Sequence, residues 1–132
     1  MPVRFLVLLA VISLAACQAP GAGPTAPAPV EVSGVVRAGP VCPVVTQPAD
    51  PACDDRLVSG AVMLVTTPDG REVARATSGD DGGFTLHLAP GDYVVVPQPV
   101  DGLMGTAAAV DVRVVAGEAP APLSVTYDTG IR

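Results

Sequence analysis

The sequence contains no lysine, no asparagine and no tryptophan, so its seven basic residues are all arginines. Thirteen acidic residues oppose them and give a formal net charge of −6 at pH 7. Nucleic-acid affinity depends largely on neutralising phosphates with Lys and Arg, so this balance argues against a nucleic-acid partner. The absence of asparagine excludes N-linked glycosylation, because that modification needs an Asn side chain.

Aromatic residues are also scarce, at 3% of the chain, so a core must be built mainly from Val, Leu and Ala. The single histidine, His87, lies between Leu86 and Leu88, and this alternation places it on the solvent side of a strand. No Ser lies in a nucleophile-elbow context such as G-x-S-x-G. We therefore predict no catalytic residue and expect a non-enzymatic protein.

The amino terminus carries a localisation signal. After Arg4, an apolar run from Phe5 to Ala16 ends at Cys17. The run is about 12 residues long, which is too short to span a bilayer as a helix, since that needs about 20. Leu14 lies three positions before Cys17 with small residues between them, and this pattern resembles the lipobox of bacterial lipoproteins. The alternative is an ordinary secretory signal that is cut near Ala16.

The lipoprotein resemblance implies cleavage between Ala16 and Cys17 and acylation of Cys17. Two or three acyl chains would anchor the chain firmly in a cell membrane or outer membrane, with its domain facing the periplasm or exterior. The expected organisation is a signal peptide at 1–16, the lipidated cysteine and a flexible tether at 17–30, and a β-sandwich domain at 31–132. The tether is rich in Pro, Ala and Gly, and as extended polyproline II it would reach roughly 35–40 Å.

From residue 30 onward, short apolar runs alternate with turn signals and no helical periodicity is present. Alternation with a period of two residues places Phe84, Leu86 and Leu88 on one face, with Tyr93 and Val95 on the same side. This pattern predicts an all-β fold, a seven-stranded antiparallel β-sandwich of the immunoglobulin-like kind. The expected strands are residues 30–37, 60–67, 71–77, 84–88, 93–96, 108–115 and 123–127.

Three segments carry a family resemblance: a Gly-Ala strand at 60–65, a D-G-x-F hairpin at 81–86 and a P-G-x-Y strand at 90–95. Together they resemble the carboxypeptidase regulatory-like domain, a prealbumin-like sandwich related to Cna B-type modules. The resemblance implies that Phe84 and Tyr93 fill the core and that the domain is an accessory or binding module. Without Lys and Asn, this chain cannot form the isopeptide bond of many Cna B-type modules.

The segment 38–59 departs from the family pattern and contains Cys42 and Cys53, the two cysteines left once Cys17 is lipidated. An even pair in an exported protein predicts a disulfide, with two free thiols as the alternative. Acidic pairs at 54–55 and 80–81 offer oxygen ligands for calcium but lack the D-x-D-x-D-G spacing of a calcium loop. No metal site and no cofactor is predicted.

The connection 96–106 holds two large apolar residues, Leu103 and Met104, which either cap the end of the sandwich or contact a partner. We expect a membrane-anchored binding or structural module of the cell envelope, with an envelope protein as its possible partner. The alternative is binding of a small ligand or carbohydrate. Sugars stack on exposed aromatic rings, and only Tyr127 is free of an expected core position.

Overall fold

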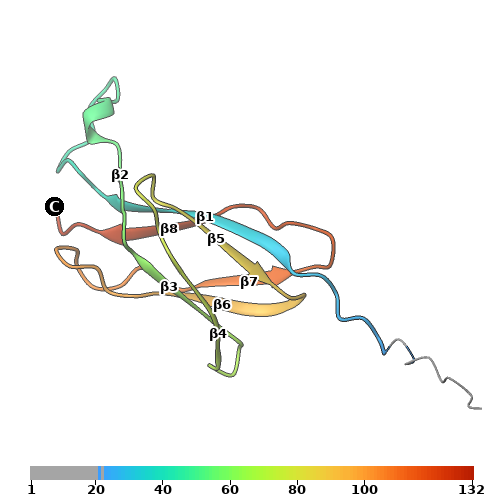
Figure 1. Cartoon of the computed structure of the whole chain (residues 1–132). Helices are drawn as coiled ribbons and strands as arrows, with labels where there is room; N and C mark the ends of the chain where they lie inside the picture. Colours follow the sequence, from blue (N-terminus) through green and yellow to red (C-terminus); the bar gives the residue numbers. More distant parts are fainter. Residues whose placement is uncertain (1–20, 22) are drawn as a thin grey trace, which may run out of the picture.

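The structure is a computed structural model and describes residues 21 and 23–132. The predicted signal peptide, its cleavage site after Ala16 and the lipidation site at Cys17 lie outside the described residues. Residues 23–29 are exposed, irregular chain that leads into the first strand (Figure 1). Among the described residues there is no helix long and apolar enough to cross a membrane.

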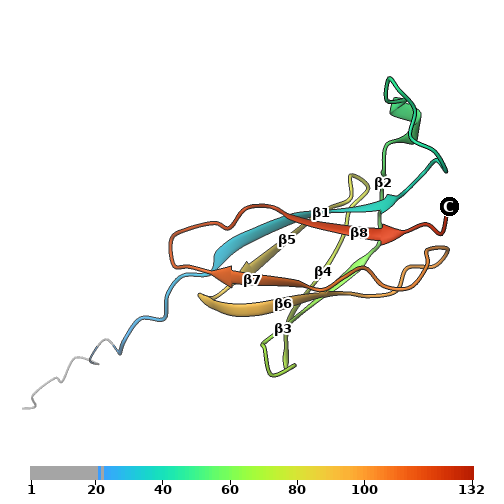
Figure 2. The same cartoon turned by 180° about the vertical axis from the view of Figure 1, so that it is seen from behind.

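Two four-stranded sheets pack face to face (Figures 1 and 2). In sheet A, β1 is central and pairs with β2, β5 and β8; in sheet B the order is β4-β3-β6-β7. The strands are β1 (Val30–Gly39), β2 (Arg56–Leu57), β3 (Val62–Thr66), β4 (Glu72–Thr77), β5 (Gly83–Leu88), β6 (Gly91–Pro97), β7 (Val110–Val114) and β8 (Leu123–Asp128).

The seven predicted strands are all present, with bounds within two residues of those expected. The count of seven is wrong, because the described chain has an eighth strand, β2, in the segment expected to be a loop. Sequence alternation could not reveal it, since β2 has two residues, both of them exposed. It forms only because Arg37 and Ala38 of β1 offer it a free edge.

The sandwich is also not purely antiparallel, because β8 pairs in parallel with β1, from Gly34 opposite Leu123 to Gly39 opposite Asp128. The reason is the path of the chain. Strand β7 belongs to sheet B and ends near the tether, so the connection crosses to sheet A there and β8 starts at that end (Figure 2). Both β1 and β8 therefore run away from the tether.

The core lies between the sheets and is built from aliphatic side chains, as the composition requires. Phe84, Leu86 and Leu88 point inward from β5, as predicted, and His87 between them is exposed. Most of the remaining core is valine, which suits strands because its branched side chain packs well on a pleated surface. The largest fully buried side chains are Tyr127, Met63, Val32, Val36, Val65, Val95, Val125 and Pro97.

The expected roles of the two tyrosines need correction. Tyr127 has no exposed surface, and its hydroxyl donates a hydrogen bond of 2.6 Å to the carbonyl of Gln98. Tyr93 is only half-buried against the core, and its hydroxyl donates to the carbonyl of Ala89 at 2.8 Å. Tyr93 lies near the start of β6, where the sheet ends and fewer side chains cover the ring.

Candidate functional site

Three segments far apart in the sequence meet at the end of the sandwich opposite the tether (Figures 1 and 2). They are the loop between β1 and β2, residues 40–55; the connection after β6, residues 98–106; and the residues that follow β8, 129–132. We call this end the tip and residues 40–55 the disulfide loop. Because β1 runs from the tether to the tip, the domain holds the disulfide loop at its far end.

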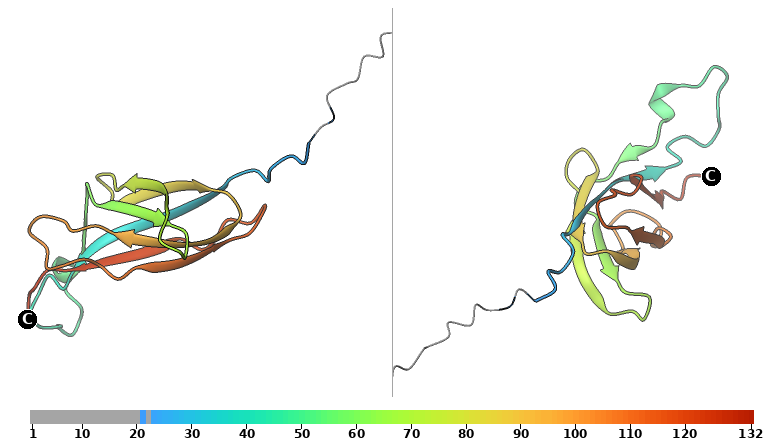
Figure 3. Two further views of the ribbon diagram at one scale, coloured as in Figure 1. Left: turned by 90° about the horizontal axis from the view of Figure 1, so that it is seen from below. Right: turned by 90° about the vertical axis from the view of Figure 1, so that its right-hand side faces the viewer.

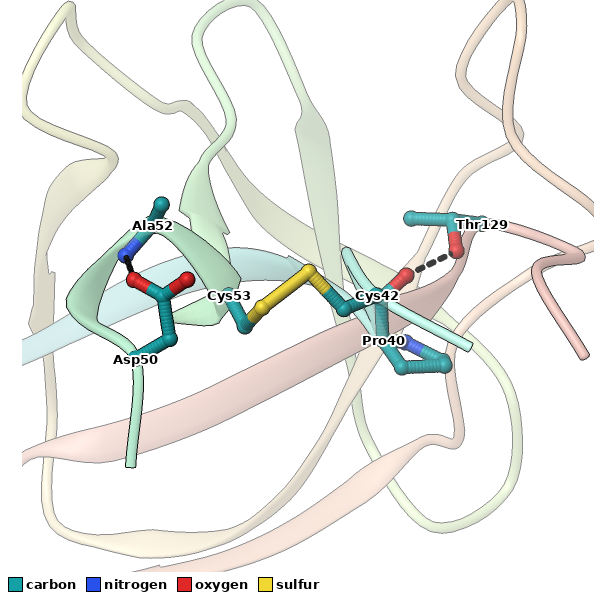
Figure 4. Close-up of a disulfide and its surroundings, with 6 residues drawn as sticks. All are labelled: Pro40, Cys42, Asp50, Ala52, Cys53 and Thr129. Carbon is teal, nitrogen blue, oxygen red and sulfur yellow. Dashed lines mark hydrogen bonds between the residues drawn. A yellow bond between two sulfur atoms is a disulfide. The ribbon is translucent and has the colours of Figure 1, made fainter. Parts of the chain in front are cut away.

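The predicted disulfide is present between Cys42 and Cys53 (Figure 4). It closes the loop around a short 3-10 helix, η1 (Pro51–Cys53). Asp50 caps this helix, since its side-chain oxygen accepts a hydrogen bond from the amide of Ala52 at 2.9 Å. The proline-rich loop therefore has a defined conformation despite having no buried residue in its helix.

A second attachment fixes the base of the disulfide loop to the other side of the tip. The hydroxyl of Thr129 donates a hydrogen bond to the carbonyl of Pro40 (Figure 4). The amide of Thr129 also donates to the carbonyl of Gly39, at 3.1 Å. These bonds continue the parallel pairing of β8 with β1 by one residue, so the loop leaves the sheet in a fixed direction.

The disulfide loop encloses a shallow hollow of about 240 Å³. Its apolar wall includes Val44 and Val45, which are 70% and 88% exposed. The sequence contained this signal, an apolar pair between two cysteines, and we did not single it out. Three carboxylates and no basic group also line the hollow, whose full lining is Pro40, Cys42, Val44, Val45, Thr46, Ala49, Asp50, Cys53, Asp54 and Asp55.

Leu103 and Met104 have different surroundings. Leu103 is half-buried and packs against the core, so it caps the end of the sandwich. Met104 is 58% exposed, and its amide donates a hydrogen bond of 2.8 Å to the carbonyl of Asp128. The side chain of Met104 lies directly over Gly130. Of the pair, Met104 alone is available on the tip surface.

Asp128 organises the residues after β8. Its carboxylate accepts hydrogen bonds from the amide of Gly130 at 2.7 Å and from the guanidinium of Arg132 at 2.7 and 3.1 Å. These bonds, chiefly that with Arg132, lower the pKa of Asp128 from 3.8 to about 2. Sequence analysis did not predict this arrangement of Asp128 with Gly130 and Arg132.

We expect the Asp128 carboxyl to titrate near pH 2, and Arg132→Ala to move its pKa back toward 3.8. Because the folded pKa is the lower one, the ionised group stabilises the fold above pH 3.8, and this contribution is lost as the pH falls through 2. Carboxyl NMR titration of both variants measures the shift. An unchanged midpoint in Arg132→Ala would contradict the assigned cause.

The remaining candidates have structural surroundings. His87 faces solvent on sheet A, 4.0 Å from the carboxylate of Glu31. Asp80 accepts a hydrogen bond from the hydroxyl of Ser59, and Asp81 accepts one from the amide of Gly83, so this acidic pair shapes the β4–β5 turn. Within the described part of the chain, no three His, Cys, Asp or Glu side chains are grouped in a way that could hold a metal ion.

Comparison with known proteins identifies the fold. No family model and no curated protein matches the sequence. The Bacillus anthracis TIE protein is similar with a TM-score of 0.53 and 19% identity, over 76% of this chain and 16% of that one. GBS52, the minor pilin of Streptococcus agalactiae, is similar with a TM-score of 0.57 and 12% identity, over 78% of this chain and 45% of that one.

These similarities agree with a two-sheet β-sandwich and show the fold alone. This chain spans less than half the length of either protein. The narrower resemblance to carboxypeptidase regulatory-like domains stays a prediction.

Replacing both Cys42 and Cys53 with alanine should loosen the disulfide loop while leaving the sandwich intact. On the chain-entropy model, a disulfide that closes a loop of this length stabilises the fold by roughly 3 kcal/mol. That value holds only if the loop stays ordered in the folded protein after the disulfide is removed. Since the loop contributes no core residue, we expect it to relax, so that the midpoint of global unfolding changes little. Hydrogen exchange at residues 40–55 should rise strongly. A large drop in global stability would show that the loop folds cooperatively with the core.

Proposed function

We propose that this protein is a non-enzymatic, lipid-anchored module of the bacterial envelope that presents its tip to an envelope protein. The observation that carries the proposal is the position of the tip: the disulfide loop, the connection after β6 and the residues after β8 gather at the end remote from the tether (Figure 1). A domain held at one end by a membrane anchor exposes its opposite end to partners.

The chemistry of the tip suits protein recognition. Rigid loops on a β-scaffold are frequent binding surfaces, because the scaffold bears the cost of ordering them. Here the loop is fixed by the Cys42–Cys53 disulfide and by the Thr129 hydrogen bonds, and it exposes Val44 and Val45. The adjacent carboxylates would favour a partner whose contact surface is basic around an apolar centre.

The envelope location rests on the lipobox-like sequence ending at Cys17 and on the Pro-rich residues that follow it. It is supported by the similarity to GBS52, a minor pilin. We propose that a lipid on Cys17 anchors the protein in either the cell membrane or the outer membrane.

Carbohydrate binding is less well supported. The hollow of about 240 Å³ is smaller than the roughly 300–1,000 Å³ of ordinary small-molecule pockets. Tyr127, the ring that sequence analysis left free, is buried, and the hydroxyl of Tyr93 is bonded to backbone. Among the described residues only the ring of Tyr93 keeps exposed surface, beside a second hollow of about 390 Å³, and because that ring is half-buried it offers a sugar only part of a stacking face.

The test is in-cell photo-crosslinking of the full lipidated chain, with a photoreactive amino acid at Val45. Amine-reactive reagents are unsuitable, because the chain has no lysine. Val115 is the matched control: it is a 47% exposed valine that follows β7, at the tether end. We expect one envelope protein to be captured from Val45 and not from Val115.

Cys17→Ala, which removes the anchoring thiol, should release the protein from the membrane fraction and abolish this capture. Identical products from Val45 and Val115 would overturn the docking role of the tip. Membrane retention of Cys17→Ala would overturn the anchor.

A further inference from the structure

The outer face of sheet B, which points away from the core, carries aliphatic side chains. Val62 and Leu64 on β3 and Val94 and Val96 on β6 alternate with the fully buried inner residues of the same strands. All four are half-buried but do not contact the core cluster. Leu64 lies directly across from Val96, so the four form one continuous patch in the middle of the sheet.

This patch departs from the usual pattern of a two-layer sandwich. An antiparallel sheet with one wet face normally alternates apolar and polar residues, whereas a strand covered on both faces is an unbroken apolar run. The two central strands of sheet B are of the second kind, with VMLV in β3 and YVVV in β6. Within residues 21 and 23–132, sheet A covers the inner side and no third layer covers the outer side (Figure 3).

Charged pairs of both signs border the patch. On the edge strand β4, Arg75 contacts Glu72 at 3.1 Å, and across β6 and β7, Arg113 contacts Asp92 at 2.9 Å. Asp111 on β7 adds one negative charge. An apolar centre with a polar, charged border is the anatomy of a protein interface. In a chain of net charge −6, two copies repel each other least where such balanced pairs meet.

We infer that the outer face of sheet B packs on the same face of a second copy of this chain. A two-fold contact uses one surface twice, so that surface must complement itself. Glu72 and Arg75 lie next to each other along one edge strand and both point outward. Consider a two-fold axis that lies parallel to the sheet, runs perpendicular to its strands and passes midway between Glu72 and Arg75. It places Arg75 of each copy opposite Glu72 of the other copy, and Val94 opposite Val96.

The size of the face limits the strength of this contact. Four strands of about five residues give a surface of roughly 19 by 17 Å from the standard strand spacing and rise. This is about 320 Å² per copy, below the roughly 800 Å² per partner of specific, stable interfaces, so the dimer is weak and forms only at high local concentration.

The absence of lysine allows a clean test on the full chain in cells. Thr77→Lys adds an amine on the outer face of sheet B, and Thr85→Lys adds one on the outer face of sheet A, each replacing an exposed strand threonine. With two differently tagged copies and an amine-specific crosslinker, the Thr77→Lys chain should give a homodimer and the Thr85→Lys chain should not. Equal products, no dimer, or a product with a different protein would each overturn the inference.

Charge reversal then tests the self-complementary contact. In the Thr77→Lys chain, Glu72→Arg and Arg75→Glu should each lower the homodimer roughly tenfold, because like charges replace the pairs. Both side chains are exposed, so folding should not change. Co-expression of the two variants should restore crosslinking between them. If the two co-expressed variants do not crosslink to each other, the proposed geometry is overturned. The docking of the tip is tested separately at Val45, so this result does not affect it.

Discussion

Replacing Tyr127 with alanine should lower the free energy of unfolding by about 3–5 kcal/mol, the cost of deleting a large buried aromatic side chain. Tyr127 has no exposed surface and is the largest fully buried residue of the core. It points inward from β8, and its hydroxyl bonds to the carbonyl of Gln98, just after β6. It therefore connects sheet A with the chain that leaves sheet B.

Tyr93→Ala is the matched control. Its ring is half-buried at the start of β6, so its removal should cost on the order of 1–2 kcal/mol. Urea denaturation of the two variants measures the difference. If Tyr93→Ala were the more damaging change, the original expectation from sequence would be right and the burial of Tyr127 in the structure would be contradicted.

Two further measurements isolate the hydroxyl. Tyr127→Phe should cost about 1–2 kcal/mol, since the carbonyl of Gln98, a partly buried residue, loses its hydrogen-bond partner. Burial also raises the pKa of Tyr127 above its ordinary value of 10. The neutral phenol therefore stabilises the fold below pH 10, and this contribution is lost as the pH rises from 10 through the higher folded pKa. Tyr127→Phe should show a weaker loss of stability in that range.

The tyrosines show how far local sequence patterns determine this fold. Alternation along β5 predicts its inward residues correctly, because Phe84, Leu86 and Leu88 form its one apolar set. Strand β6 has an unbroken apolar run, so alternation cannot tell how deeply each residue is buried. The depth of Tyr93 and Tyr127 depends on how far along the sandwich each lies, and that position is set by the pairing of strands distant in sequence.

The candidate site was predictable to a similar extent. The spacing of Cys42 and Cys53 in an exported chain was enough to predict their disulfide. That the disulfide loop, Met104 and Thr129 share one end of the molecule depends on the parallel pairing of β1 with β8. Nothing in the sequence of β8 distinguishes a parallel from an antiparallel partner, so the tip could only be seen in the structure.

Ser78→Ala should be the most damaging substitution of a polar residue, at about 2–4 kcal/mol. Ser78 is 4% exposed and is the only buried polar or charged side chain of the described residues. Its hydroxyl donates to the carbonyl of Val58 at 2.6 Å and accepts from the amide of Ala61 at 2.9 Å. Both backbone groups belong to buried residues, so water cannot replace the hydroxyl. Leaving each of these groups without a hydrogen-bond partner costs roughly 1–3 kcal/mol of folding stability.

This serine joins the end of β4 to the chain that returns from the disulfide loop to β3. Ser59→Ala is the matched control, because Ser59 lies in the same crossing but is exposed, and its hydroxyl bonds to the exposed carboxylate of Asp80 at 3.1 Å. We expect that change to cost less than about 0.5 kcal/mol. Thermal and urea unfolding of both variants give the comparison, and equal losses would mean that water reaches Val58 and Ala61 after all. If Ser78→Ala alone is destabilised, a single hydroxyl fixes where the chain that returns from the disulfide loop re-enters the sandwich.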